Sequence, residues 1–216
     1  MPAALQWWVD RPDTGAANMR ADRDLLARAE SDPGVPLVLR VYGWSTPAVS
    51  LGFHQDESLL DLDALRRDGV DHVRRPTGGA AVLHHREFTY AVVGRLGTEG
   101  LGRRVLEIHD AIAECLRSAL VDLGVDAARG GEGRPSGFAC FSAAGGHEIT
   151  VGGRKLVGSA LRRTRQAFLQ HGSLLVDAGH ERLPWYERGD DASRHAAEAA
   201  LAARTVTLQQ LGRASI

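Results

Sequence analysis

The sequence predicts an α+β protein in which helices cover a mixed, largely antiparallel sheet. Short apolar segments of strand length recur along most of the chain, and glycine or proline separates many of them. A few longer segments instead carry apolar residues at the spacing of one helix face. The chain has 216 residues, of which 44% are hydrophobic and 25% are charged. Because this composition suits one globular domain with a sizeable core, we expect residues 1–216 to form a single domain.

The first half of the chain is expected to combine strands with two helices. Residues 16–29 carry apolar side chains on or near one helical stripe, and Pro33-Gly34 ends that helix. A second helix is expected over residues 58–67, before Gly69. The expected strands are Leu5–Val9, Leu37–Tyr42, Ala48–Leu51, 70–75, 81–84 and 88–93.

The second half contains the clearest helix of the sequence, over residues 102–123. Apolar residues repeat there at helical spacing, and Gly124 is a natural C-terminal stop. Cys115 falls on the apolar side of this helix, which favours a structural cysteine in the core. Gly152-Gly153 has the spacing of a hairpin turn. The other elements expected are a loop over 128–137, strands over 138–141, 148–151, 155–161 and 168–176, and a mostly helical segment over 180–211.

Charge and composition exclude several classes of function. The formal net charge is −1, so bulk electrostatics do not favour a nucleic-acid partner. No apolar run reaches the roughly 18 residues of a membrane span, and the first residues lack the pattern of a signal peptide. Cys115 and Cys140 make no disulfide framework, so a reducing cytoplasm is the expected location. The sequence has no metal-ligand spacing, phosphate-binding loop, dinucleotide motif or serine-hydrolase elbow.

Lys155 stands out because it is the single lysine among the 26 lysine and arginine residues, and the rest are all arginine. The bias has no functional meaning by itself. A position that stays lysine, however, can require a compact amine that changes its protonation state, which a guanidinium cannot do. Chance placement is the alternative.

Cys140 precedes Lys155 by 15 residues and follows a glycine-rich loop. A reactive thiolate needs a nearby cation or base, and a lysine can serve either as ammonium or as a neutral amine. The structural alternative is a buried Cys140 and a Lys155 paired with Glu148. Across the Gly152-Gly153 hairpin, Glu148 and Lys155 would lie diagonally on one sheet face. The residues alone leave both interpretations open.

Two further segments carry small residues that would let the backbone approach a ligand closely. One is a Gly-Gly pair between strands with polar residues on both sides. The other interrupts a strand with Gly-Ser-Ala and continues on the next strand with His-Gly. Each pattern by itself is more typical of a turn or of a structural histidine. The candidate binding residues are Arg75, Thr77, Gly78, Gly79, His84, Gly158, Ser159, Ala160, His171 and Gly172.

Taken together and in this order, these segments resemble the lipoate–protein ligase, octanoyltransferase and biotin ligase superfamily. Residues 74–84 are similar to its Arg-Arg-x-Ser/Thr-Gly-Gly-Gly-Ala-Val-x-His segment, with Ala80 in place of the third glycine. Residues 153–160 resemble its Gly-x-Lys-[Ile/Val]-x-Gly-Ser-Ala segment, and 171–175 resemble the His-Gly-[Ser/Thr]-Leu-Leu strand. Residues 15–26 look like its opening helix. The resemblance covers most of the chain and implies the catalytic-domain fold of biotin and lipoate ligases.

Within this superfamily, Cys140 favours the LipM-type octanoyltransferases. The pattern formed here by Cys140, Phe141, Glu148 and Lys155 resembles the corresponding pattern of those proteins. The resemblance implies that octanoyl-acyl carrier protein is the donor and that Cys140 carries the octanoyl group as a thioester. Lys155 would activate the thiol or aim the acyl carbonyl.

The resemblance also implies the acceptor, a lysine of a lipoyl domain such as the glycine cleavage H protein or a dehydrogenase E2. The donor is already activated, so no metal and no cofactor are implied. We expect a monomer with no nucleic-acid or membrane partner.

Two alternatives stay open. In an ATP-dependent lipoate or octanoate–protein ligase, which needs ATP and Mg²⁺, Lys155 would contact the acyl-adenylate and Cys140 would be incidental. A non-catalytic homologue would bind acyl groups or carriers without turnover. That second alternative rests on the end of the chain at Ile216, where LipM-type proteins usually carry a further helical segment. We therefore expect the C-terminal accessory segment to be short or absent.

Overall fold

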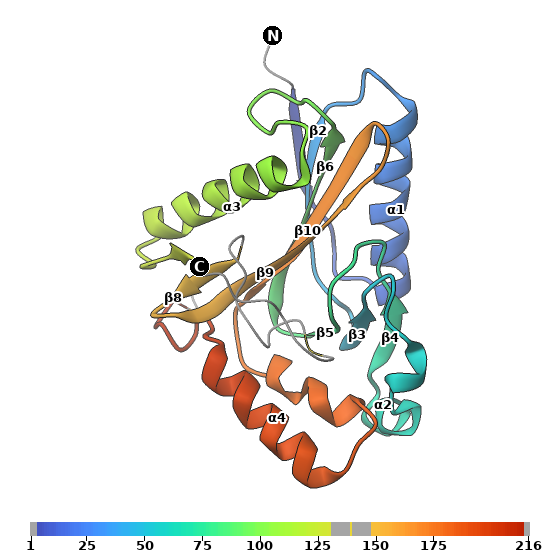
Figure 1. Ribbon diagram of the computed structural model, residues 1–216, viewed down its shortest axis with the longest axis vertical. Coiled ribbons are helices and arrows are strands. Elements are labelled where there is room, and N and C mark those ends of the chain that lie inside the picture. The colour runs from blue at the N-terminus through green and yellow to red at the C-terminus, as the bar shows by residue number, and fades with distance from the viewer. Residues whose placement is uncertain (1–3, 131–138, 140–147, 214–216) are drawn as a thin grey trace.

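The computed structural model describes residues 4–130, 139 and 148–213 and contains two sheets packed with helices (Figure 1). The large sheet has seven strands in the order β1-β2-β6-β10-β9-β8-β7, and the small sheet has the order β4-β3-β5. The strands are β1 (Leu5–Val9), β2 (Leu37–Tyr42), β3 (Ala48–Leu51), β4 (Asp71–Arg74), β5 (Val82–His84), β6 (Glu87–Arg95), β7 (Ala128–Arg129), β8 (Ile149–Val151), β9 (Arg154–Arg163) and β10 (Ala167–Leu175).

Helices surround these sheets. They are α1 (Gly15–Ser31), α2 (Leu62–Asp68), α3 (Val105–Asp122), α4 (Asp191–Arg204) and the 3₁₀ helices η1 (Glu57–Leu59) and η3 (His180–Tyr186). Among the described strands, β1–β2 and β3–β4 pair in parallel and the other pairs are antiparallel. The expected α+β class with a mixed, mostly antiparallel sheet is confirmed.

Helices α1 and α3 cover opposite faces of the large sheet, as Figure 1 shows. Side chains alternate between the two faces of a strand, so neighbouring residues of β6 join different cores. Ala91 and Val93 pack with Met19 and Leu26 of α1, whereas Tyr90 packs in the cluster that contains Ile108 of α3. The alternation in β6 therefore builds a three-layer arrangement.

The small sheet packs in a third core with α2, η3 and α4. Val49 and Leu51 of β3 are fully buried in that core together with Leu65 of α2 and Leu183 of η3. Figure 1 shows α4 and η3 side by side below the sheets. This packing holds β3 and β5 against the large sheet, and both sheets contribute to the site described below. None of the helices in the described ranges is long and apolar enough to cross a lipid bilayer.

The helix expected over residues 58–67 begins later than predicted. The structure has η1 there, then an extended residue, and then α2 (Leu62–Asp68). Asp61 caps the new helix, because its carboxylate accepts a hydrogen bond from the Ala64 N–H at 3.0 Å.

The expectation that Cys115 lies in the core is wrong, because its side chain is exposed. The buried positions of α3 are Ile108, Ile112, Ala113 and Leu120. Successive members of this stripe turn around the helix away from Cys115, which is left outside the packed face. The expected strand over 138–141 falls almost entirely outside the described residues. Of its members only Ala139 is described, in an isolated bridge to Ala81.

Candidate functional site

Most of the predicted binding residues surround one pocket, to which α1 and both sheets contribute. Its empty space is about 400 Å³, part of it open to solvent. The described lining residues are Met19, Tyr42, Trp44, Ser50, Arg75, Val82, His84, Thr89, Gly158, Ser159, Ala160, His171, Gly172 and Ser173. The structure thus brings together seven of the ten predicted binding residues: Arg75, His84, Gly158, Ser159, Ala160, His171 and Gly172. Thr77, Gly78 and Gly79 form the turn behind this wall.

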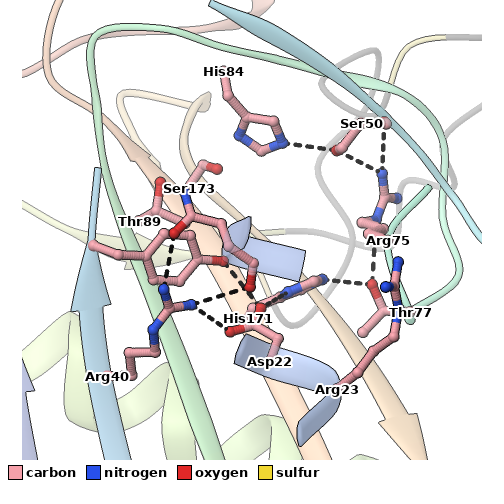
Figure 2. Close-up of polar contacts among 12 residues, drawn as sticks. Asp22, Arg23, Arg40, Ser50, Arg75, Thr77, His84, Thr89, His171 and Ser173 are labelled. Carbon is pink, nitrogen blue, oxygen red and sulfur yellow. Dashed lines mark hydrogen bonds and ion pairs between the residues drawn. The ribbon is translucent and has the colours of Figure 1, made fainter. Parts of the chain in front are cut away.

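One side of the pocket is a buried chain of hydrogen bonds from α1 to the Gly-Gly turn (Figure 2). Asp22 accepts from Nδ1 of His171 at 2.9 Å, and Nε2 of His171 lies 2.6 Å from the Thr77 hydroxyl. Burial lowers the pKa of His171 more than the Asp22 carboxylate raises it. The ring is therefore neutral, so Nδ1 donates to Asp22 while Nε2 accepts from Thr77.

A second chain of the same kind crosses the small sheet. Nε2 of His84 lies 2.7 Å from the Ser50 hydroxyl, and Nδ1 lies 2.6 Å from Oε1 of Glu87. The same Glu87 oxygen accepts from the hydroxyls of Thr89 and Ser173, both at 2.7 Å. Burial raises the pKa of Glu87, but His84 and these hydroxyls outweigh burial and the net pKa is lowered. Glu87 is therefore held as a carboxylate.

Arg75 joins the two chains of hydrogen bonds. Its Nε donates to the Thr77 hydroxyl at 3.2 Å, and its Nη1 donates to the Ser50 hydroxyl at 3.2 Å. A guanidinium can only donate, so both hydroxyls accept from Arg75, and Thr77 directs its own hydrogen to the neutral His171 ring. Nη2 of Arg75 also donates to the carbonyls of Gly78 and Ala80, at 2.7 and 2.8 Å. Arg75 thereby fixes the Gly-Gly turn and the hydroxyls at the same time.

Asp22 has further partners besides His171. Besides His171 it accepts from Nη1 of Arg40 at 2.8 Å and from the Tyr42 hydroxyl at 3.1 Å. Burial opposes the charge of Arg40, but Asp10 and Asp22 outweigh it and raise the pKa of Arg40. Burial and the Asp22 charge raise the pKa of Tyr42 well above its usual value, so the phenol stays a donor.

Two glycines allow close backbone approaches at this site. A Cβ on Gly172 would lie 2.6 Å from the Gly158 carbonyl oxygen and 2.7 Å from the Tyr90 ring. A Cβ on Gly52 would lie 1.9 Å from the Gly79 carbonyl oxygen, in direct collision with the turn. Gly172 therefore permits the approach of β9 and β6 to β10, and Gly52 permits the approach of the turn to β3.

Lys155 is buried, with 1% of its surface exposed, and its ammonium pairs with Glu148. The pair crosses the Gly152-Gly153 hairpin, since Thr150 lies opposite Lys155 in the register and Glu148 precedes Thr150 by two positions. This is the ion pair of the structural interpretation. Lys155 and the wall residue Gly158 share β9.

Cys140 lies outside the described residues. Within the described ranges no three His, Cys, Asp or Glu side chains are grouped to hold a metal ion.

Residues 14–216 match the family model of the lipoyl protein ligase A/B catalytic domain. The chain belongs to this family. Two similar relatives are the octanoyltransferases LipM of Symbiobacterium thermophilum, 45% identical over 172 residues, and of Kyrpidia tusciae, 44% identical over 179 residues. The matches cover 76% and 79% of this chain but 62% and 65% of those relatives. The chain thus spans less than two thirds of the length of these relatives.

Solved structures show the same family fold. A crystal structure of lipoate-protein ligase A bound with ATP matches with a TM-score of 0.75 at 22% identity, over 100% of this chain and 80% of that one. The bipartite lipoate protein ligase of Thermoplasma acidophilum matches with a TM-score of 0.73 at 21% identity, over 97% of this chain and 75% of that one. At these identities the likeness concerns the fold alone.

In this lipoyl ligase family member, a second hollow lies beside Arg74, Arg75 and Pro76, which precede the Gly-Gly turn. This arginine groove encloses about 760 Å³ of empty space, part of it open to solvent. Arg162 donates to the Pro76 carbonyl at 2.9 Å, and its guanidinium lies 4.8 Å from the centre of the exposed Phe53 ring. The described lining residues of the arginine groove are Arg23, Leu26, Ala27, Glu30, Phe53, Arg74, Arg75, Pro76, Arg162 and Thr164.

Several residues of the site were missed by the sequence analysis. Ser50 and Glu87 complete the His84 chain, and Arg40 pairs with Asp22. A signal existed for Arg40, because alternation in Leu37–Tyr42 puts it on the buried face with Val38 and Tyr42. Ser50 likewise interrupts an entirely buried strand. Asp22 entered only as part of the resemblance of the first helix.

Proposed function

We propose that this family member transfers an octanoyl group from acyl carrier protein to a lysine of a lipoyl domain, with Cys140 as the intermediate acyl carrier. The observation that carries the proposal is the burial of the single lysine, Lys155, on the strand that also forms the wall of the pocket. The name octanoyltransferase LipM borne by the similar relatives gives independent support.

In the first step, the Cys140 thiolate attacks the carbonyl carbon of the octanoyl thioester. A new C–S bond forms and the carrier's thiolate leaves, so one thioester replaces another at little cost in free energy. In the second step, the neutral amine of the acceptor lysine attacks the Cys140 thioester. An amide bond forms, the Cys140 thiolate leaves, and the amine gives up one proton. Because a thioester donor is already activated, the sequence of steps needs no ATP and no metal.

The ion pair of Lys155 with Glu148 is compatible with this role. A buried ammonium lowers the energy of a thiolate beside it. The carboxylate of Glu148 would keep the ammonium oriented, because one lone buried cation is costly without a partner. The pocket between β9, β10 and the small sheet would hold the octanoyl chain, since the polar atoms of its described walls are directed at one another.

Intact-mass measurement after incubation with octanoyl-acyl carrier protein, without acceptor, tests the proposal. We expect the protein to gain one octanoyl group, and neutral hydroxylamine to remove it, because hydroxylamine cleaves thioesters and spares amides. Cys140→Ala should not be labelled. Cys115→Ala is the matched control and should be labelled normally, because exposed Cys115 lies on α3 and does not line the pocket.

Transfer at the wild-type rate by Cys140→Ala would overturn the thioester route. Release of pyrophosphate with ATP, Mg²⁺ and lipoate would then identify an ATP-dependent ligase. Binding of carriers with neither reaction would identify a non-catalytic homologue.

A further inference from the structure

The pocket is lined by many polar side chains, and their polar atoms are already hydrogen-bonded within the protein. Every polar side chain among the described lining residues makes a hydrogen bond to another protein group. The bonds not yet given are Trp44 Nε1 to the Thr89 hydroxyl at 2.9 Å and Ser159 to the Tyr90 hydroxyl at 2.7 Å. The Trp44 ring also stacks on His84, with ring centres 3.9 Å apart. A ligand therefore meets ring faces, carbon atoms and polar side chains that already have protein partners.

The network is locked by groups outside the wall. Asp22 and Glu87 do not line the pocket, yet they hold His171, His84, Thr89 and Ser173 in fixed directions. The hydroxyls of Tyr42, Thr89 and Ser173 cannot rotate toward a ligand without leaving Asp22 or Glu87 with one donor fewer, which costs free energy.

We propose that this self-paired wall selects an acyl chain without hydrogen-bonding groups and discriminates against hydroxyacyl chains of similar size. The inference rests on the proposed function and adds the class of substrate. A hydroxyl on the chain would lose its water and would have to compete with these existing hydrogen bonds for a partner in the described wall, which is unfavourable. Apolar sites reject an added hydroxyl by up to about a hundredfold. Ser173 and Thr89 act as specificity-determining residues, because they occupy the Glu87 oxygen that a ligand hydroxyl would otherwise reach.

Competition between matched acyl-carrier donors tests the inference. The donors are octanoyl, nonanoyl, 3-hydroxyoctanoyl and 8-hydroxyoctanoyl, where nonanoyl replaces the terminal hydroxyl of the last by a methyl group of similar size. For the wild type we expect octanoyl transfer to exceed that of at least one hydroxyacyl donor by about tenfold to a hundredfold. Nonanoyl should lose less than 8-hydroxyoctanoyl, because it has the size of the latter without its polarity.

Ser173→Ala gives the sharper test. It removes one donor to Glu87 and leaves a space of hydroxyl size on the pocket side of that oxygen, so a ligand hydroxyl can take the place of the serine. The ratio of hydroxyacyl to octanoyl transfer should rise about tenfold for one hydroxyl position. The ratio within one variant cancels any general loss of activity. Thr89→Val frees the same Glu87 oxygen and the Trp44 N–H, so it should raise the ratio in a second way. The control is Ser31→Ala at an exposed position, and its ratio should stay at the wild-type value.

Wild-type rates within twofold for all four donors would overturn the inference, and so would unchanged ratios in both Ser173→Ala and Thr89→Val. Calorimetric binding of octanoic and 8-hydroxyoctanoic acid to the same proteins gives the comparison without transfer. A protein that prefers octanoic acid but transfers nothing would refute the proposed function and retain the selective pocket.

Discussion

The pocket and the arginine groove are neighbouring hollows, because Arg75 lines both. Behind the pocket wall, the charged groups are buried and held by several partners, as Asp22 is by Arg40, Tyr42 and His171. In the groove, Arg23 is exposed and Phe53 leaves 45% of its surface in solvent. Burial separates the two: it forces polar groups to pair with one another inside, while the groove keeps charge that an incoming partner can use.

This difference predicts that substitutions in the pocket act through stability and chemistry, whereas substitutions in the groove act through association. The first two experiments below pair one interior change with a counterpart in the groove, and the last two test one region each.

The largest effect is expected from Asp22→Ala. The substitution leaves Arg40 and His171 facing a gap where a buried carboxylate stood. Loss of one partner from a buried ion pair costs about 3–5 kcal/mol of unfolding free energy. Urea denaturation measures the change. The unfolding free energy of Arg23→Ala in the groove should stay within about 0.5 kcal/mol of wild type. Equal losses of stability in the two variants would refute the difference proposed between the pocket and the groove.

A large kinetic effect is expected from Lys155→Arg, although the charge is kept. The guanidinium is planar and bulkier than the ammonium, and it cannot act as a neutral base. Octanoyl transfer should fall below about a tenth of the wild-type rate, equivalent to about 1.4 kcal/mol in the barrier. Arg162→Lys, the converse exchange in the groove, should change the rate much less. A Lys155→Arg enzyme that retains more than a tenth of the rate shows that no lysine-specific role exists.

A moderate effect is expected from pH. The pKa of His171 in the folded protein lies below its ordinary value of 6.5 because burial disfavours the charged ring. As the pH falls through about 6.5, the unfolded chain binds this proton first, so the unfolding free energy decreases until the folded-state pKa is reached. Urea denaturation from about pH 7.5 to 5.5 measures the slope. His171→Gln should be less stable but have a shallower slope, and an unchanged slope would contradict the neutral, buried ring.

The smallest effect is expected in the groove. Arg162→Glu should weaken the apparent affinity for the acyl carrier donor several-fold, because an acidic carrier is attracted by positive charge. The affinity of the variant should also depend less on salt, because salt screens this attraction and the Debye length is only about 10 Å at 0.1 M. Neighbouring Arg163 and Arg165 are exposed and would add to the attraction. The control is Arg66→Glu on α2, outside the groove. A wild-type affinity that does not change between low and high salt excludes this docking surface.

The first three strands of the chain show how far local patterns reach. β1, β2 and β3 have the predicted boundaries, because their apolar residues lie between strong turn signals. The start of α2 was misjudged, since the helical spacing continued through η1 while the Asp61 cap decided the boundary. Cys115 was misplaced for a related reason: a helical wheel ranks the positions around a helix but does not show where the packed sheet ends.

By itself, the sequence determined the class of fold, the unusual Lys155, and the two segments that supply most of the pocket wall, because these depend on local spacing and residue type. Only the tertiary structure decided which hydroxyl meets which histidine. Thr77 and His171 are 94 positions apart and Asp22 and His171 are 149 apart, so no local pattern joins them. The same holds for Ser50, Glu87 and Arg75, whose roles depend on the two sheets meeting. Hydrogen-bond direction arises from burial and from fixed donors such as the Arg75 guanidinium, and both exist only once the chain has folded.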